Sequence, residues 1–289
     1  MPPASFEHYW GFNSYHDEDD AAFLFAWLMT CCVNFEAGIT MIIAVLRAGP
    51  RSRFNRMVRL ASQHPYGMAT DLNAHRVLLF LFDHAHPAQR VQLMCSIYHH
   101  FTTLSRDRVG QIFLLHLANT VPNDLAAYLM FGINNNAAFL CRDREGVRII
   151  RVCIRRFGVN GFEPLLHYIL CNLELFLRDT RRSLVLQAVI EACIVHETQR
   201  AQHADPIVSN FTWHVIDHIF VFGDQARMMS VVNDPVGNRI VQAIIRSSTM
   251  RQRSYVCDHL VTRFVDISVD RYGSFVALAV VDHVVDYMH

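Results

Sequence analysis

The chain has 289 residues, of which 52% are hydrophobic and 18% are charged, with 26 basic and 26 acidic side chains. This composition is too apolar for a disordered chain, and 12 glycines with 9 prolines are too few for a fibrous protein. The zero net charge argues against a protein held to nucleic acid by bulk charge alone. All the basic residues are arginines, whose guanidinium groups keep their charge and stack on flat rings.

The N-terminal residues and the cysteines indicate a compartment. The first 20 residues are proline-rich and then acidic, which is not the pattern of a signal peptide, and we expect them to form an N-terminal extension. The apolar stretch 21–33 ends at Asn34, short of the roughly 20 residues that a membrane span needs. The eight cysteines form no C-x-x-C pair. These features predict a reduced, soluble, cytoplasmic protein without a membrane segment.

A repeat of 36 residues runs along the chain. Seven copies of one motif begin at residues 35, 71, 107, 143, 179, 234 and 270. Six of the seven start with Asp and five carry Gly three positions later, so the register holds across five equal intervals. Such self-similarity is typical of a solenoid, in which each unit buries its apolar face only against its neighbours.

The residues of one unit predict three short helices. Asp before a turn is a helix N-cap, and the Gly permits a close approach or an unusual backbone angle. An apolar helix follows the motif, and a second helix follows a Pro, Asn or Gly break, as in 87–98, 122–131 and 162–171. A third, shorter helix leads into the next motif, as in 226–232. The predicted fold is therefore an all-α superhelix of about seven three-helix repeats over residues 21–289.

One interval between motifs is 55 residues long instead of 36. We place the 19 extra residues at about 196–214, where the sequence is polar and rich in helix breakers, and expect a surface loop there. Such a loop either binds a partner or is a tolerated insertion.

The motif Asp-x-x-Gly-x-x-Val-x-Gln, which opens the middle helix of a three-helix unit, resembles the Pumilio (PUF) repeat. The copies at 233–242 and 270–279 match it most closely, and the resemblance covers roughly residues 20–289. It implies that the middle helices line a concave face on which each repeat reads one base of single-stranded RNA. Two side chains one helical turn apart would meet the base edge, and the residue after the first would stack on the base.

The resemblance assigns base-reading residues repeat by repeat. Repeat six is complete, with Asn238 and Gln242 at the base edge and Arg239 stacking, a combination similar to the family's uracil reader. Repeat five has Ser183 and Gln187, similar to an adenine reader, but Leu184 replaces the flat stacking residue. Because the family binds RNA antiparallel, repeats five and six would favour a 5′-U-A-3′ step.

The other repeats depart from the code. Repeat seven keeps Ser274 and Phe275 but has Leu278 where the family uses Gln or Glu. In repeat four, Arg148 could stack and Arg151 could meet a base or a phosphate, and Arg76 is the stacking candidate of repeat two. The alternatives are a solvated helix face for the polar residues and burial for Phe275. Repeats one and three place apolar residues at code positions, namely Ile39, Ile43, Ile112 and Leu115.

Catalytic, metal and cofactor sites are not predicted. The sequence has no Gly-rich phosphate loop, no G-x-S-x-G and no paired carboxylates on one helix face. His214 and His218 stand four residues apart, but no third metal ligand accompanies them. We therefore expect no enzymatic activity and no cofactor.

The resemblance implies an RNA-binding regulator of messenger RNA translation and stability, acting on 3′ untranslated regions. The eroded code predicts weak affinity and relaxed specificity, with protein partners on the convex face or the insertion. The family usually has eight repeats, whereas seven copies are seen here. The alternative is a degenerate solenoid that serves as a protein-interaction scaffold without specific RNA binding, which the apolar code positions favour, or a decaying paralogue.

Overall fold

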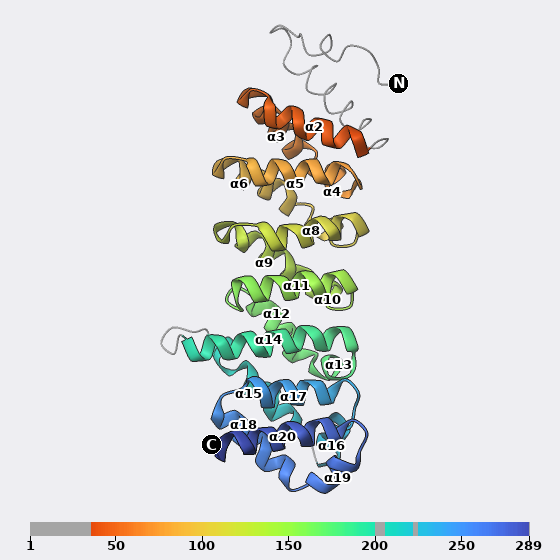
Figure 1. Cartoon of the computed structure of the whole chain (residues 1–289), viewed down its shortest axis with the longest axis vertical. Helices are drawn as coiled ribbons and strands as arrows, with labels where there is room; N and C mark the ends of the chain where they lie inside the picture. The colour runs from red at the N-terminus through yellow and green to blue at the C-terminus, as the bar shows by residue number, and fades with distance from the viewer. Residues whose placement is uncertain (1–35, 200–205, 222–224, 289) are drawn as a thin grey trace. The chain divides into compact units, whose positions relative to one another are not determined.

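The computed structural model describes residues 36–199, 206–221 and 225–288. Within these residues all regular structure is helical, which confirms the predicted all-α solenoid. The helices form two compact units, each a stack of helical repeats (Figure 1). Unit 1 takes in the described residues up to His100 together with Asp107–Phe113, and unit 2 takes in Phe101–Arg106 and all described residues from Leu114 onward.

Unit 1 contains the first two repeats. In each, a middle helix is followed by an outer helix, and a short helix leads from the first repeat into the second. Its helices are α2 (Glu36–Ala48), α3 (Arg51–Gln63), α4 (Pro65–Thr70), α5 (Ala74–His84), α6 (Pro87–Tyr98) and the first half of α8 (Arg108–Thr120).

Unit 2 repeats the same order of short, middle and outer helix. Its middle helices are α11 (Arg144–Phe157), α14 (Thr180–Gln199), α17 (Gly237–Ser247) and α20 (Gly273–Met288), which pack in that order (Figure 1). The outer helices are α9 (Ala126–Asn135), preceded by the 3-10 turn η2 (Asn123–Leu125), α12 (Glu163–Cys171), α15 (Pro206–Phe220) and α18 (Met250–Val261). The short helices are α7 (Phe101–Leu104), α10 (Ala137–Leu140), α13 (Leu173–Arg178), α16 (Gln225–Val232) and α19 (Phe264–Val269).

The repeated Asp caps the middle helix, as predicted. The carboxylate of Asp234 accepts hydrogen bonds from the backbone N–H groups of Val236 and Gly237, both at 2.8 Å. That of Asp143 accepts from Gly146 N–H at 2.8 Å. These bonds satisfy amides that have no partner inside the helix. The same role is filled by Asp71, Asp107, Asp179 and Asp270.

The repeated Gly permits a close backbone approach. A Cβ at Gly146 would lie 2.5 Å from the carbonyl oxygen of Leu140, in the preceding short helix. Gly237 and Gly273 have the same relation to Val231 and Ile267, at 2.4 and 2.6 Å. The short helix and the middle helix of a repeat can therefore pack this closely only where no side chain intervenes.

The core of each repeat comes from the apolar positions of its middle helix. On α11, Ile149, Ile150, Cys153 and Ile154 are at most 1% exposed. Cys141, Cys193 and Cys257 are also buried, whereas Cys171 is exposed. Burial raises the pKa of the Cys153 thiol to about 12. Buried cysteines of this kind behave as small apolar residues.

The prediction of a loop at 196–214 is wrong for most of that segment. Residues 196–199 continue α14, and residues 206–214 belong to α15, so most of the extra length extends two helices. The breaker signal is limited to the Asp205–Pro206 step, and proline is tolerated in the first turn of a helix. Residues 200–205 and the predicted extension 1–20 lie outside the described residues.

No helix in the described part of the chain combines the length and apolar character that crossing a membrane requires.

Candidate nucleic-acid interface

The candidate interface is the exposed side of the four middle helices of unit 2, α11, α14, α17 and α20. Neighbouring helices of this layer pack against one another, so equivalent positions of successive repeats lie next to each other. On α11, α14 and α17 the first code position (Val147, Ser183 and Asn238) is buried, and the residue that follows it is more exposed, because consecutive helical residues point about 100° apart.

Repeat six brings its three predicted residues together on α17. Asn238 is only 3% exposed, and its Nδ2 donates to the carbonyl oxygen of Asp234 at 2.6 Å. Gln242 is half-buried, and its Nε2 donates to Asn238 Oδ1 at 2.8 Å. Arg239 is exposed. Arg239 and Gln242 therefore face solvent, while Asn238 is held beneath them.

Because Asn238 is buried, it does not lie on a solvated helix face. Its side chain is also not exposed, as that of a residue in direct contact with a base would be. Its spacing explains the difference, because Asn238 precedes Val241 by three residues and Ile245 by seven and therefore continues their buried stripe. This spacing of Asn238 from the apolar residues is visible in the sequence.

Repeat five shows the same arrangement on α14. Ser183 is 1% exposed, and its hydroxyl donates to the carbonyl oxygen of Thr180 at 2.9 Å. Gln187 and Leu184 are half-buried. Only Gln187 therefore presents a polar group toward solvent at the predicted base edge of this repeat.

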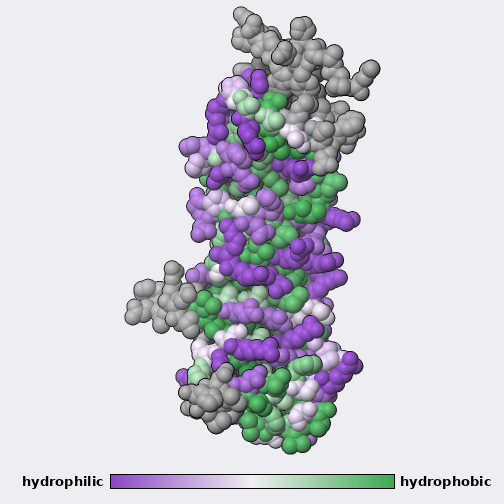
Figure 2. Space-filling view, viewed as in Figure 1, coloured by the Kyte–Doolittle hydropathy of each residue, from purple (hydrophilic) through white to green (hydrophobic). Residues whose placement is uncertain are grey.

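Repeat seven presents an apolar surface. Phe275 is 54% exposed on α20, so the alternative that its ring is buried is wrong. Leu278 and Val281, which follow at helical spacing, are 55% and 43% exposed. Ser274 is half-buried, and its hydroxyl donates to the carbonyl oxygen of Arg271 at 3.1 Å. Hydrophobic residues gather around α19 and α20 on the face seen in Figure 2.

Repeat four places two predicted arginines on α11. Arg148 is exposed, and its Nη1 lies 2.7 Å from Oε2 of Glu145, one turn earlier. Arg151 is half-buried, and its Nε is buried without a hydrogen-bond partner. Arg148 is therefore paired within its own helix, whereas Arg151 keeps a buried donor that no described group satisfies.

Unit 1 is considered by itself. Arg76, predicted to stack in repeat two, is exposed on α5. The residue before it, His75, is 8% exposed, and its Nδ1 lies 3.1 Å from the carbonyl oxygen of Asp71. In α2, Ile39 is fully buried and Thr40 is exposed. Both repeats therefore share the pattern seen in unit 2.

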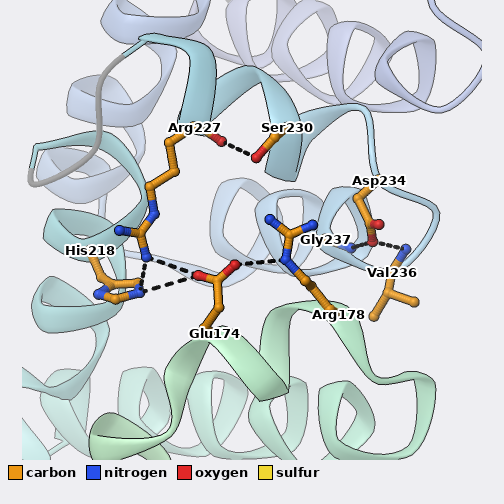
Figure 3. Close-up of polar contacts among 8 residues, drawn as sticks. All are labelled: Glu174, Arg178, His218, Arg227, Ser230, Asp234, Val236 and Gly237. Atoms are coloured by element: carbon orange, nitrogen blue, oxygen red, sulfur yellow. Dashed lines mark hydrogen bonds and ion pairs between the residues drawn. The ribbon is translucent and has the colours of Figure 1, made fainter.

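A polar cluster that the sequence did not reveal joins repeats five and six (Figure 3). Glu174 on α13 pairs through Oε1 with Nε of Arg178 at 2.7 Å and through Oε2 with Nη2 of Arg227 on α16 at 2.9 Å. The same Nη2 lies 2.6 Å from Nε2 of His218 on α15. The partners are up to 53 residues apart in the sequence, so no local sequence motif predicts these contacts.

The ionisation of this cluster follows from its contacts. The hydrogen bond from Arg178 holds the pKa of Glu174 below its usual range, and the charge of Arg227 adds to the effect. Burial lowers the pKa of His218, and the adjacent Arg227 lowers it further. A neutral His218 accepts a hydrogen bond from Arg227, which locks α15 and α16 to α13.

Metal ligands do not converge within the described residues, where no three His, Cys, Asp or Glu side chains are grouped to hold an ion. Of the candidate pair, His218 contacts Arg227 instead, and His214 is exposed on α15.

The model of the Pumilio-family RNA binding repeat matches residues 66–97, 228–261 and 263–277. The second match covers α17, and the third reaches the first turn of α20. Comparison with curated protein sequences gives no significant match.

Solved structures share this fold at low sequence identity. The Puf4 RNA binding domain bound to the HO endonuclease RNA 3′ UTR recognition sequence is 16% identical, with a TM-score of 0.70 over 89% of this chain and 75% of that one. PUF-8 in complex with PBE-RNA is 15% identical, with a TM-score of 0.67 over 89% and 69%. The RNA-binding domain of yeast Puf5p bound to AAT2 RNA is 10% identical, with a TM-score of 0.60 over 92% and 87%.

Proposed function

We propose that this chain, a divergent member of the Pumilio repeat family, binds single-stranded RNA through the exposed side of its middle helices. One observation carries the proposal. Within the segment that matches the family repeat, α17 exposes the flat guanidinium of Arg239 beside the amide of Gln242. Guanidinium planes and aromatic rings are surfaces on which unpaired bases stack, and an amide offers both a donor and an acceptor to a base edge.

The base contact in repeat six falls to Gln242 rather than to Asn238. One N–H of the Gln242 amide is used by Asn238, so the second N–H and the carbonyl oxygen remain for a base. Asn238 acts as a positioning residue, because its own amide is bonded to the backbone of α17. This arrangement suits the donor and acceptor edge of uracil.

Affinity is expected to be low. A stacked base contributes about 1–3 kcal/mol by alanine substitution. At the predicted stacking position, repeats six and seven expose the planar side chains of Arg239 and Phe275, whereas repeat five has Leu184 there. With few complete readers, we expect micromolar binding with a modest preference for a 5′-U-A-3′ step.

The cellular role that we propose is regulation of messenger RNA translation and stability, through 3′ untranslated regions and recruited protein partners in the cytoplasm. The chain would perform no chemistry of its own. RNA-bound relatives with the same fold support the choice of ligand.

Fluorescence anisotropy tests this function. Full-length protein is titrated into a labelled single-stranded RNA that contains U-A steps and into an all-cytosine RNA of equal length, each at two salt concentrations. Readout of bases predicts a preference for the U-A sequence that persists at the higher salt, because counterion release is independent of sequence. Equal affinity for both RNAs, or no binding, would contradict the proposal.

A second candidate function is binding of an apolar peptide, which the exposed Phe275, Leu278 and Val281 favour. The variant Leu278→Gln separates the two functions, since it restores an amide at a code position. RNA reading predicts that this variant binds RNA about three- to tenfold more tightly, the equivalent of one added hydrogen bond. A peptide-binding surface predicts no gain.

A further inference from the structure

One face of α11 carries four arginines, Arg144, Arg148, Arg151 and Arg155, which we call the arginine row. They follow one another at intervals of four, three and four residues, so they share a single face of the helix. At 1.5 Å per residue the row extends over roughly 16 Å. Figure 2 shows hydrophilic side chains in a band over α11.

Three of the four arginines in the row have no acidic partner among the described residues. Positions 142–157 hold six arginines and two acidic residues, in a chain whose net charge is zero. The carboxylate of Asp143 caps Gly146, and that of Glu145 pairs with Arg148. In the described part of the chain, no carboxylate forms an ion pair with the other three members of the row.

The other middle helices of unit 2 do not repeat this feature. Each has at most two arginines at the four equivalent positions, and α14 has none. Those positions hold Thr180, Leu184, Gln187 and Glu191 on α14, Pro235 before α17 with Arg239, Gln242 and Arg246 on it, and Arg271 before α20 with Phe275, Leu278 and Asp282 on it. Repeat four therefore differs from its neighbours in chemistry while keeping their backbone geometry.

A guanidinium has five N–H donors and no acceptor, and it pairs bidentately with phosphate oxygens. Four such groups along one helix extend well beyond the edge of a single base. They also offer that edge no hydrogen-bond acceptor. We propose that the arginine row binds consecutive phosphates of an RNA backbone, so that repeat four holds the strand without reading a base. This inference rests on the proposed RNA binding and names the part of the RNA that repeat four contacts.

The test is the salt dependence of RNA binding by the double variant Arg151→Gln, Arg155→Gln. Each phosphate contact adds about 0.7 to the slope of log affinity against log salt for a single strand. Losing two contacts should lower the slope by about 1.4, which makes the affinity loss between 50 and 200 mM salt about sevenfold smaller. The preference for U-A over all-cytosine RNA should remain, because Arg239 and Gln242 are intact.

Two further variants serve as controls. Arg106→Gln with Arg251→Gln removes the same charge from exposed arginines that lie over the rings of Phe139 and Trp213 and should leave the slope unchanged. Arg151→Lys with Arg155→Lys keeps the charge and should keep the slope while losing affinity, since Lys cannot pair bidentately. Far-ultraviolet circular dichroism confirms that each variant is folded.

The outcomes separate this inference from the proposed function. RNA binding with base preference but an unchanged slope in the glutamine variant overturns the arginine row alone. If the wild-type protein binds no RNA, the proposed function fails, and the assignment of the arginine row to an RNA backbone fails with it, even where inorganic polyphosphate binds. Competition by polyglutamate as strong as by polyphosphate identifies a surface for acidic peptides and overturns the proposal, as does binding of neither RNA nor polyphosphate.

Discussion

Gln242 Nε2 donates a hydrogen bond to the side-chain oxygen Oδ1 of Asn238, one turn earlier on α17, at 2.8 Å. Asn238 in turn donates to the backbone of Asp234, so a chain of two hydrogen bonds fixes the orientation of the more exposed amide. We propose separate roles for the two residues that the sequence predicts as a pair of base readers: Asn238 orients the amide of Gln242, and Gln242 contacts the base.

We predict that Gln242→Ala weakens RNA binding about three- to tenfold, with little change in thermal stability, because it removes one half-exposed hydrogen-bonding group. Asn238→Ala should weaken binding similarly but should also lower the free energy of unfolding by about 1–2 kcal/mol, because it empties a buried hydrogen-bonded site. Anisotropy titrations and thermal melts measure the two effects. Equal stability losses in both variants would contradict the division of roles.

The repeated Gly yields a second prediction. Gly146→Ala places a Cβ 2.5 Å from a backbone oxygen of the preceding short helix, so the two elements must separate. We expect a loss of about 1–3 kcal/mol in the free energy of unfolding, as for other overpacked sites.

Gly67→Ala is the matched control, since nothing lies within 4 Å of its added Cβ and the residue is helical. It should leave stability unchanged or raise it by up to about 1 kcal/mol. Chemical denaturation monitored by circular dichroism compares the two. A Gly146→Ala variant as stable as Gly67→Ala would show that the close approach carries no energetic weight.

Much of the fold could be predicted because the same local sequence features recur in successive repeats. The Asp cap, the close-packed Gly and the apolar helix that follows are each visible in the sequence, and the register of 36 residues predicts equivalent positions for α11 and α14 and for α17 and α20. The helices expected at 87–98 and 162–171 appear as α6 and α12, with at most one residue of difference at an end.

The remainder depended on relations that no local pattern contains. The burial of Asn238 and Ser183 requires knowing which face of the middle helix meets the rest of the repeat. The polarity of residues 196–214 predicts a loop, whereas residues 196–199 lengthen α14 and residues 206–214 belong to α15. The Glu174 cluster joins three helices across repeats five and six.

That cluster predicts a dependence of stability on pH. The folded pKa of His218 is lowered from 6.5, so below about pH 6.5 the unfolded chain takes up a proton that the folded chain resists. Stability contributed by the neutral ring is therefore present above that pH and is lost as the pH falls. The lowered pKa of Glu174 acts in the same direction below about pH 4.5.

His218→Gln isolates the first effect, because its amide oxygen can still accept a hydrogen bond from Arg227 but does not titrate. Thermal melts between pH 7.5 and 5 should show a smaller decrease in Tm for this variant than for the wild type. Parallel decreases would exclude His218 as the titrating group.

The cysteines should differ sharply in reactivity. Burial raises the pKa of Cys141 and Cys153 to about 12, and that of Cys257 to about 11, so few thiolates form at neutral pH. Cys171 is exposed, with its Sγ 3.5 Å from Nε2 of His167. Iodoacetamide labelling of the native protein, read by peptide mass spectrometry, should modify Cys171 well before these three. Early labelling of Cys153 would mean that α11 opens readily.

The most direct measurement of RNA recognition by the middle helices is the site of photo-crosslinking to a single-stranded RNA that carries 4-thiouridine at its U-A step. The account predicts a crosslinked peptide from α17 that contains Arg239 and Gln242, lost in the presence of excess unmodified U-A RNA and retained with excess all-cytosine RNA. Crosslinks confined to the outer helices α12, α15 and α18, or no crosslink at all, would contradict it.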